Sequence, residues 1–239
     1  MKSIISYSVV LFNILVTLST TIVTLIDFYT GRLSRERLDK RFVWWSKKLL
    51  YSADIQYSIF GQENVDINKS QKTIIMCNHT SLYDIPLAVL SINSSIRMLV
   101  KKELMQVPLW GKAMLVSDFV SIDRKNFRNA IKDLKKAEET LEKGIILWIS
   151  PEGTRSKTGK LLPFRRGGFK LAMEMKAQII PMGIRGCEKI MPAKSLKIKR
   201  GRQVEIHFGQ PVDASNYSNQ NRKELIKTVE EKIRYLSGQ

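Results

Sequence analysis

The chain is poor in the residue types that form disulfides and bind metals. Its 239 residues include two cysteines, Cys77 and Cys187, and two histidines, His79 and His207. The cysteine spacing indicates neither a disulfide nor a metal site, and isolated thiols are typical of a reducing compartment. We therefore expect no structural disulfide and no bound metal.

Internal repeats and low-complexity tracts are also missing, which argues against solenoid and compositionally biased architectures. A chain of 239 residues with 44% hydrophobic content can bury one sizeable core, and it would form two domains only if both were small. We expect a single folded domain.

Charge is absent from residues 3–26, where Ile, Val, Leu, Phe and Tyr occupy more than half of the positions. A helix of this length, about 36 Å, could cross the hydrocarbon core of a bilayer. Its eight serines and threonines lower the hydrophobicity, so a helix that lies in one leaflet is the alternative. A cleaved signal peptide fits poorly, because the run is too long and no small-x-small pattern precedes the charges.

Positive charge follows this run at once. Between residues 32 and 48 there are seven Lys and Arg residues against two acids, with Trp44 and Trp45 among them. Basic residues mixed with tryptophan beside an apolar helix are typical of the cytoplasmic interface of a membrane. The sequence therefore predicts a membrane-anchoring helical segment over residues 1–50, and a domain over residues 51–239 on the cytoplasmic face of the plasma (inner) membrane.

The domain itself is strongly basic. The formal net charge is +18, and residues 155–202 contain fourteen Lys and Arg residues against two glutamates. Such a surface suits an anionic partner, such as acidic lipid headgroups, a phosphorylated substrate or nucleic acid, unless it only serves solubility. Nucleic acid is disfavoured, because aromatic stacking platforms are expected for it and this stretch has only Phe164 and Phe169.

Short apolar segments alternate with amphipathic ones, which predicts an α/β fold with a layered, mostly parallel or mixed sheet flanked by helices. The clearest helix, residues 126–143, has apolar residues at 3- and 4-residue spacing, and another is expected at residues 222–236. Functional groups of such folds gather at strand ends. We expect strands at residues 55–60, 73–77, 97–100, 119–122, 145–149, 179–184 and 204–208.

The segment Asn-His-Thr-Ser-Leu-Tyr-Asp occupies residues 78–84, directly after one of these strands. An imidazole needs a second group to fix its tautomer and stabilise its charged form before it takes a proton from an alcohol. Asp84 can serve His79 in both ways, because a strand-to-helix turn can bring the two together. When the pair is taken alone, the alternative is an ordinary histidine at a helix start.

A second polar segment, Pro-Glu-Gly-Thr-Arg-Ser, occupies residues 151–156 after another expected strand. The guanidinium fork of Arg155 and the backbone N–H groups of a glycine-containing loop can hold a phosphate. Arg124 and Lys101 follow two other strands and would add positive charge at the same sheet edge. Ordinary surface salt bridges are the alternative for these side chains.

Three further residues have competing interpretations. Glu152 is either a general acid or base, or an architectural carboxylate that pairs with a neighbouring arginine and holds the loop, and we favour the second. Cys77 lies inside an apolar run, so we expect a buried and unreactive thiol. His207 belongs to an alternating segment whose polar members point away from the core, so we expect it at the surface.

Taken together, these segments resemble the glycerolipid acyltransferase family, and most of all its bacterial 1-acylglycerol-3-phosphate O-acyltransferases. The family's Asn-His-x-Ser-x-x-Asp block is matched at residues 78–84. Its Phe-Pro-Glu-Gly-Thr-Arg-Ser block is matched at residues 151–156, with Ser150 in place of the Phe. The order and spacing of the blocks agree over about residues 55–212.

A third block of the family, Gly-x-x-Phe-Ile-Asp-Arg, is only partly present. Residues 122–124 match it, whereas Asp118 and Ser121 replace the Gly and the Phe. Shorter similarities occur at residues 164–167 and 180–182. The incomplete block leaves the identity of the acyl acceptor more open than the chemistry.

The resemblance implies an enzyme that transfers a fatty acyl group from an acyl thioester, acyl-CoA or acyl-ACP, to the sn-2 hydroxyl of 1-acylglycerol 3-phosphate, giving phosphatidic acid. His79 would be the general base and Asp84 the residue that orients it. A thioester is already activated, so no cofactor is expected besides this co-substrate. The residues implied for substrate binding are Lys101, Arg124, Glu152, Gly153, Thr154 and Arg155.

Two alternatives remain open. One is an acyltransferase for another acceptor, such as a lyso-ornithine lipid or glycerol 3-phosphate. The other is a non-enzymatic basic protein that binds membranes peripherally. The partners we expect are membrane lipids, lysophosphatidic acid and acyl-CoA or acyl carrier protein, and we expect no nucleic acid.

Overall fold

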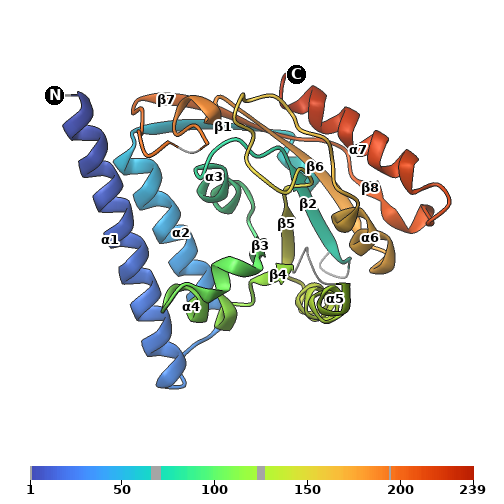
Figure 1. Cartoon of the computed structure of the whole chain (residues 1–239), viewed down its shortest axis with the longest axis horizontal. Helices are drawn as coiled ribbons and strands as arrows, with labels where there is room; N and C mark the ends of the chain where they lie inside the picture. Colours follow the sequence, from blue (N-terminus) through green and yellow to red (C-terminus); the bar gives the residue numbers. More distant parts are fainter. Residues whose placement is uncertain (1, 66–70, 123–126, 194) are drawn as a thin grey trace.

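One mixed β-sheet runs through the molecule, with helices packed on both faces (Figure 1). The computed structural model describes residues 2–65, 71–122, 127–193 and 195–239. The strands lie in the order β1-β7-β6-β2-β5-β3-β4, and β8 pairs with β6. In chain order they are β1 (Ile55–Phe60), β2 (Thr73–Cys77), β3 (Ile96–Lys101), β4 (Val120–Ile122), β5 (Ile146–Ile149), β6 (Gln178–Arg185), β7 (Arg202–Phe208) and β8 (Val212–Asp213).

Helices fill the connections between these strands and precede the first of them. The α-helices of the described residues are α1 (Lys2–Tyr29), α2 (Arg35–Ser52), α3 (Asp84–Ser91), α4 (Trp110–Val116), α5 (Phe127–Glu142), α6 (Arg166–Glu174) and α7 (Arg222–Leu236). Short 3₁₀ helices are η1 (Gln62–Val65), η2 (Lys102–Gln106), η3 (Cys187–Lys189) and η4 (Ala214–Asn216).

The alternation of side chains along the central strand β2 divides the core into two halves. Ile75 and Cys77 belong to the half that includes α1, α2 and α3, whereas Ile74 and Met76 belong to the half that includes α5, α6 and α7. All four side chains are fully buried. A strand covered by helices on both faces needs this continuous apolar sequence, which is why residues 74–77 carry no polar side chain.

The register of the sheet brings the two sequence blocks to one edge. β2 lies between β5 and β6 and runs parallel to both. Met76 stands opposite Ile149 of β5, so the carboxyl ends of β2 and β5 are neighbours. β3 continues the parallel set beyond β5, whereas β7 runs antiparallel to β6. Residues 78–84 and 151–156 therefore start side by side, and the expected mixed α/β sheet is confirmed.

The expected strands all form, with small shifts at their ends. Strands β1 and β2 and helix α7 have the predicted bounds, and α5 ends one residue before its predicted end. Helix α6 is not among the helices expected from the sequence, and its start, Arg-Gly-Gly, disfavours a helix. The helix forms because Phe169, Leu171 and Ala172 are fully buried against the sheet. Tertiary packing therefore overrides the low helix propensity of its first residues.

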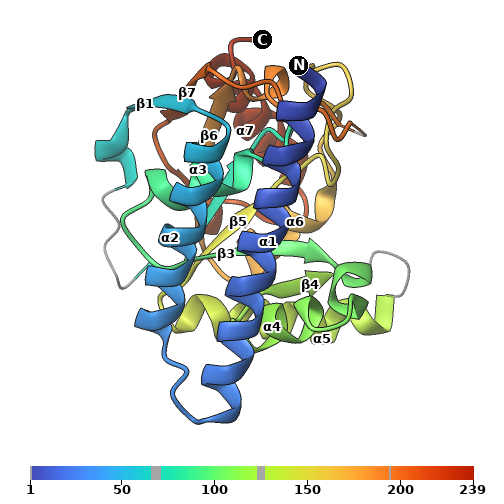
Figure 2. The ribbon, with the colours of Figure 1, turned by 90° about the vertical axis from the view of Figure 1, so that its left-hand side faces the viewer.

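The N-terminal helix packs against the domain instead of standing apart from it. Figure 2 shows α1 running alongside α2. Residues Ser6–Tyr29 are long and apolar enough to cross a membrane, judged by length and composition alone. Yet Val9, Val16 and Leu25 are buried, and the first two belong to the main core. The segment predicted as an anchor is thus also a structural layer of the domain.

A polar stripe on α1 makes this packing specific. Its members are spaced by 7, 4, 7 and 3 residues, which places them on one face of a helix. Each hydrogen-bonds to α2 or to the domain: Ser6 accepts from Ile198 N–H (2.8 Å), Asn13 donates to the Tyr83 hydroxyl (2.8 Å), Thr17 accepts from Trp45 Nε1 (3.0 Å), Thr24 accepts from Arg41 Nη1 (2.8 Å), and Asp27 forms an ion pair with Arg41.

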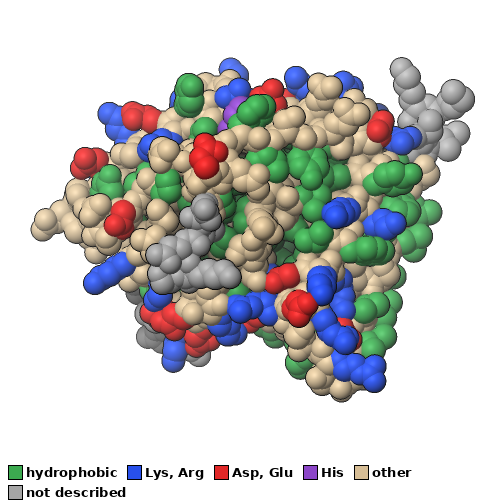
Figure 3. Space-filling view, turned by 180° about the vertical axis from the view of Figure 1, so that it is seen from behind, with side chains coloured by type: hydrophobic (Ala, Val, Ile, Leu, Met, Phe, Trp, Pro, Cys, Tyr) green, Lys and Arg blue, Asp and Glu red, His purple; other side chains and the backbone are tan. Residues whose placement is uncertain are grey.

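The opposite face of α1 is apolar and exposed. Figure 3 shows hydrophobic side chains along the edge of the molecule that α1 forms. They include Tyr7, Leu11, Ile14, Leu15, Leu18, Ile22 and Ile26. A row of this length is more than scattered surface apolar residues, and it marks an interaction site.

Candidate active site

The predicted dyad is assembled in the turn between β2 and α3. His79 Nδ1 lies 2.8 Å from Asp84 Oδ2. The Asp84 side chain is buried, at the first position of α3, whereas the His79 side chain remains 15% exposed. With Nδ1 bonded to the carboxylate, Nε2 is the nitrogen that carries the lone pair in the neutral ring. The arrangement fixes the orientation of the His79 ring, which stays partly exposed to solvent.

Backbone groups hold the carboxylate in this position. Asp84 Oδ2 also accepts hydrogen bonds from the N–H groups of Thr80 (2.8 Å) and Ser81 (2.9 Å). A buried carboxylate is tolerated only where donors compensate it, and a helix N-terminus is a favourable place for one. Three N–H groups therefore converge on one oxygen, so the carboxylate cannot turn away from His79 without losing all three bonds.

Two buried polar side chains fix the ends of the same turn. Asn78 bonds to both backbone groups of Ile184 on β6, donating to its C=O (2.9 Å) and accepting from its N–H (2.8 Å). The Ser81 hydroxyl donates to the carbonyl of Met191 (3.0 Å). The family block thus contains two structural residues around the dyad, because the turn after β2 has to be attached to the strand beside it.

Glu152 attaches the second block to the first. One carboxylate oxygen accepts from the His79 N–H and the other from the Leu162 N–H, each at 2.8 Å. The N–H of Ser156 in turn donates to the His79 carbonyl (2.8 Å). Both backbone groups of His79 are therefore bonded to the block at residues 151–156.

Among the described residues, no arginine is bonded to the Glu152 carboxylate, whose two oxygens accept from backbone N–H groups instead of the expected arginine side chain. Arg165 Nε donates instead to the backbone carbonyl of Glu152 (3.2 Å). Burial raises the pKa of the Glu152 carboxyl above its ordinary value of 4.5, and the two N–H bonds only partly oppose this. These contacts support the architectural interpretation, and direct binding of substrate by Glu152 stays a prediction.

Arg155 has the environment of an anion-binding group. Its Nη1 is buried and has no hydrogen-bond partner within the described ranges. A buried guanidinium N–H without a partner is costly, so such a group is expected to meet a ligand. Gly153 precedes it with φ +72°, in the left-handed region that favours glycine, and Thr154 is exposed.

The other positive candidates are less closely tied to the dyad. Lys101 ends β3, one strand beyond β5 at the same edge of the sheet, and its side chain is exposed. Arg124 lies outside the described residues. Substrate binding by either residue stays a prediction.

The structure confirms that Cys77 is buried, and it places His207 at the sheet edge. Cys77 is fully buried, and burial raises the pKa of its thiol well above the ordinary value, as it does for Cys187. Such thiols stay protonated and supply no nucleophile. His207 stacks on Phe60 at the edge of the sheet, with ring centroids 4.7 Å apart, and bonds to Glu205 (2.9 Å). Within the ranges that the structure describes, no group of three or more His, Cys, Asp and Glu side chains is placed to hold a metal ion.

Trp148, which was not among the residues singled out from the sequence, packs against the His79 ring. The two ring centroids are 5.5 Å apart and the ring planes are nearly perpendicular, at 83°. Such edge-to-face contacts limit how an imidazole can tilt. The sequence did contain a signal for Trp148. It lies on β5, which leads into the block at residues 151–156, and it directly precedes Ile149, the register partner of Met76.

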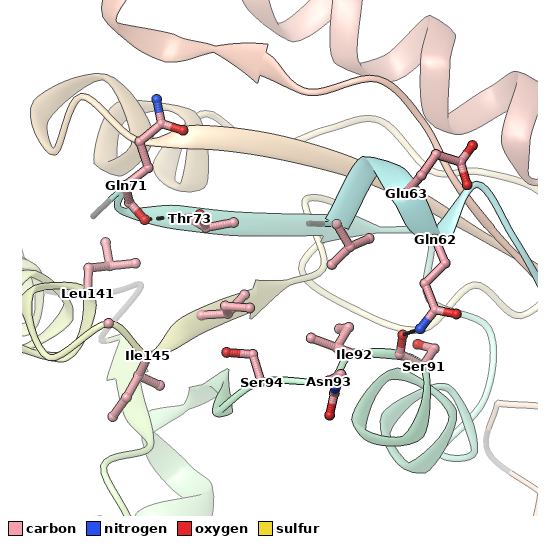
Figure 4. A pocket seen from close by; sticks show the side chains of 13 residues that line it. Gln62, Glu63, Gln71, Thr73, Ser91, Ile92, Asn93, Ser94, Leu141 and Ile145 are labelled. Carbon is pink, nitrogen blue, oxygen red and sulfur yellow. Dashed lines mark hydrogen bonds between the residues drawn. The ribbon is translucent and has the colours of Figure 1, made fainter. Parts of the chain in front are cut away.

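A cavity of about 420 Å³ lies at the opposite edge of the sheet from the dyad (Figure 4). It opens beside the amino ends of β2 and β5, between Thr73, Ser94 and Ile145. Strand β2 runs from this cavity to the turn that carries His79, so the cavity lies apart from the candidate dyad.

Comparison with known proteins gives the family. A family model described as Acyltransferase matches residues 58–185, which contain both sequence blocks. The chain belongs to the acyltransferase family. The resemblance drawn from the blocks at residues 78–84 and 151–156 is therefore confirmed, and the matched region covers the strands that carry the dyad and Arg155.

Individual relatives are similar over most of the domain. The chain is 31% identical over 159 residues to the 1-acyl-sn-glycerol-3-phosphate acyltransferase of Cocos nucifera, covering 66% of this chain and 51% of that one. It is 32% identical over 166 residues to the enzyme of that name from Helicobacter pylori, covering 66% and 70%. The chain spans about half the length of the plant relatives it matches.

The fold is also that of a solved acyltransferase. The crystal structure of the 1-acyl-sn-glycerophosphate acyltransferase from Thermotoga maritima matches with a TM-score of 0.81. The match covers 98% of this chain and 95% of that one, at 24% sequence identity. The N-terminal helices belong to the shared architecture, since nearly the whole chain is included.

Proposed function

We propose that this acyltransferase is a 1-acylglycerol-3-phosphate O-acyltransferase that forms phosphatidic acid. The observation that carries the proposal is the 2.8 Å bond between His79 Nδ1 and the buried Asp84, in a turn held by the loop of Arg155. The names of the relatives from Cocos nucifera and Helicobacter pylori support lysophosphatidic acid as the acceptor.

The dyad supplies general base catalysis for an ordinary acyl transfer. His79 Nε2 takes the proton of the sn-2 hydroxyl as the oxygen attacks the thioester carbonyl, and Asp84 stabilises the imidazolium that results. The tetrahedral intermediate then breaks its C–S bond, and the imidazolium returns the proton to the leaving thiolate. An ester and a thiol are the products, and no covalent enzyme intermediate is needed.

Arg155 is proposed to hold the phosphate of the acceptor. Its buried Nη1 lacks a protein partner, and a phosphate oxygen would provide one. Because the Arg155 loop is bonded to the backbone of His79, a phosphate held there has a fixed distance to the base. Positioning of this kind can contribute roughly 7 kcal/mol toward lowering the barrier. Lys101 and Arg124 are proposed to add positive charge to the same site.

The acceptor is a membrane lipid, and α1 explains how the enzyme reaches it. The polar stripe from Ser6 to Asp27 is bonded to the domain at both ends and in the middle of the helix. A helix held to one side of a domain along its whole length lies in one leaflet, with its apolar face in the acyl chains. We propose this arrangement over a spanning helix, with the domain on the cytoplasmic face.

An acceptor and donor panel tests the function. Purified full-length protein in detergent micelles is given acyl-CoA or acyl-ACP together with lysophosphatidic acid, glycerol 3-phosphate or a lyso-ornithine lipid, and the lipid products are separated. We expect phosphatidic acid from lysophosphatidic acid with at least one donor. A preference for another acceptor would overturn the assignment of substrate. No turnover with any pair, alongside intact vesicle binding, would favour the non-enzymatic membrane protein.

A further inference from the structure

We infer that this protein has a second membrane contact, a binding site for an anionic phospholipid, formed by residues 195–202 and the groove beside them. These residues, called here the cationic loop, lead into β7 and are remote in sequence from both catalytic blocks. The inference uses the membrane location proposed for α1 but does not depend on the acyl transfer.

The composition and exposure of the cationic loop point to a lipid surface. Lys197, Lys199, Arg200 and Arg202 are all exposed, and Leu196 directly before them in the chain is 65% exposed. The sequence has no acidic residue from 189 to 204. Within the part of the chain that the structure describes, none of these four cations has an ion-pair partner. Unpaired cations around an exposed leucine are typical of segments that bind anionic bilayers.

The backbone of the cationic loop is fixed beside the N-terminal end of α1. The N–H of Ile198 donates to Ser6 Oγ on α1 (2.8 Å), and the Ile198 side chain is buried. The N–H of Gly201 donates to the carbonyl of Ala53 after α2 (3.2 Å). The loop is therefore fixed against the N-terminal part of α1 and the end of α2, with its cations exposed.

A groove of about 600 Å³ runs between α1 and the cationic loop. Its walls include Val9 and Phe12 of α1 and Ile55 at the start of β1, and Arg200 lines it as the cation. Tyr51, Asp54 and two serines, Ser8 and Ser52, also line the groove, and Asp54 is its acidic member. Apolar walls beside a guanidinium suit a molecule with an acyl chain and a phosphate, which is the chemistry of a phospholipid.

A fluorophore on the cationic loop tests the contact directly. The native thiols Cys77 and Cys187 are fully buried, so a single exposed cysteine can be labelled. Leu196→Cys carries an environment-sensitive dye, and Tyr235→Cys, at an exposed position near the end of α7, carries it as the control. Full-length protein is added to phosphatidylcholine vesicles with or without phosphatidylglycerol.

We expect a blue shift of the dye at position 196 that is larger on the anionic vesicles, and none at position 235. Inorganic phosphate alone should give no shift, because the proposed ligand is a lipid. Equal shifts on neutral and anionic vesicles, or no shift on either, would overturn the inference. A shift with a single-stranded oligonucleotide but not with vesicles would assign the surface to nucleic acid instead.

Charge variants measure the contribution of the loop. The triple variant Lys197→Gln, Lys199→Gln, Arg200→Gln should bind anionic vesicles on the order of 100-fold more weakly than the unchanged chain. The control changes three lysines of α7, Lys223→Gln, Lys227→Gln and Lys232→Gln, with the same loss of charge. Equal weakening by both triples would mean that net charge alone acts, and would contradict a site.

Binding in the groove predicts a difference between two single charge variants, whereas a diffuse surface charge predicts none. Arg200→Gln should weaken binding to anionic vesicles several-fold more than Lys197→Gln, because Arg200 lines the groove and Lys197 does not. Equal losses would overturn the groove as the binding site. These assays contain no acyl donor, so they remain decisive even where the proposed acyl transfer fails, and thermal unfolding of each variant checks that the fold is intact.

Discussion

Asn13 on the N-terminal helix donates a hydrogen bond to the hydroxyl of Tyr83, 70 residues away, at 2.8 Å. The side-chain oxygen of Asn13, Oδ1, accepts from the Ser52 hydroxyl of α2, also at 2.8 Å. Tyr83 is buried and directly precedes Asp84, and burial raises the pKa of Tyr83 to about 12, so its hydroxyl stays neutral. The helix proposed to lie in the membrane is thus bonded to the turn that holds the dyad.

This bond should appear as an energetic coupling between α1 and the catalytic turn. Tyr83→Phe and Asn13→Val each remove one partner, so the double variant should lose less stability than the sum of the single ones, by about 1 kcal/mol. The measurement is the free energy of unfolding in detergent for all four proteins. Tyr51→Phe, an exposed tyrosine at the end of α2, is the control and should be additive with Asn13→Val.

Removing the base should abolish most of the turnover. We expect His79→Ala to lower kcat at least about 100-fold, the range for losing general base catalysis, while the fold stays intact. His207→Ala removes the only other histidine, which stacks on Phe60 at the sheet edge, and should leave kcat nearly unchanged. A folded His79→Ala protein with normal turnover would refute the assignment of the base.

Arg155→Lys should separate the two substrates. Lysine keeps the positive charge but loses the planar fork that binds two phosphate oxygens. The KM for lysophosphatidic acid should therefore rise more than the KM for the acyl donor, in assays that vary each at saturation of the other. Arg166→Lys, at an exposed arginine that begins α6, is the matched control and should change neither. Parallel increases in both KM values would mark Arg155 as structural.

Local sequence was sufficient to predict the elements but not the contacts between distant blocks. Residues 73–77 form a strand as predicted, because an unbroken apolar run fits a strand buried on both faces. The bonds from Asn78 to Ile184 and from Glu152 to the His79 N–H join residues 106 and 73 positions apart. These depend on the strand order, in which β6 and β5 flank β2, and no local periodicity encodes that order.

For the N-terminal helix too, the sequence predicted the element but not its contacts. Its length and apolar character predicted a membrane segment, and its serines and threonines were understood only as lowering hydrophobicity. In the structure, Thr17 and Thr24 are acceptors for Trp45 and Arg41 of α2. Their spacing was visible in the sequence, but their partners could be assigned only once α2 was known to pack along the same face.

Glu152 should make stability depend on pH in a way that Glu152→Gln removes. Burial raises the pKa of Glu152 above 4.5, so the folded state binds this proton more tightly than the unfolded chain does. Its contribution to the free energy of unfolding is therefore fully present below pH 4.5 and is lost as the pH rises through the raised pKa. Glutamine does not titrate, and replacing one oxygen with an amide removes the acceptor for the Leu162 or the His79 N–H.

We therefore expect Glu152→Gln to be less stable than the unchanged chain by about 1–3 kcal/mol at acidic pH, with the difference shrinking toward neutral pH. Chemical unfolding of both proteins across this interval measures the difference, and most other titrating groups cancel between them. Glu231→Gln, at an exposed carboxylate of α7, is the control and should give a difference that does not follow this course. A Glu152→Gln difference that stays constant with pH would show that the buried carboxyl does not exchange its proton on unfolding in this range.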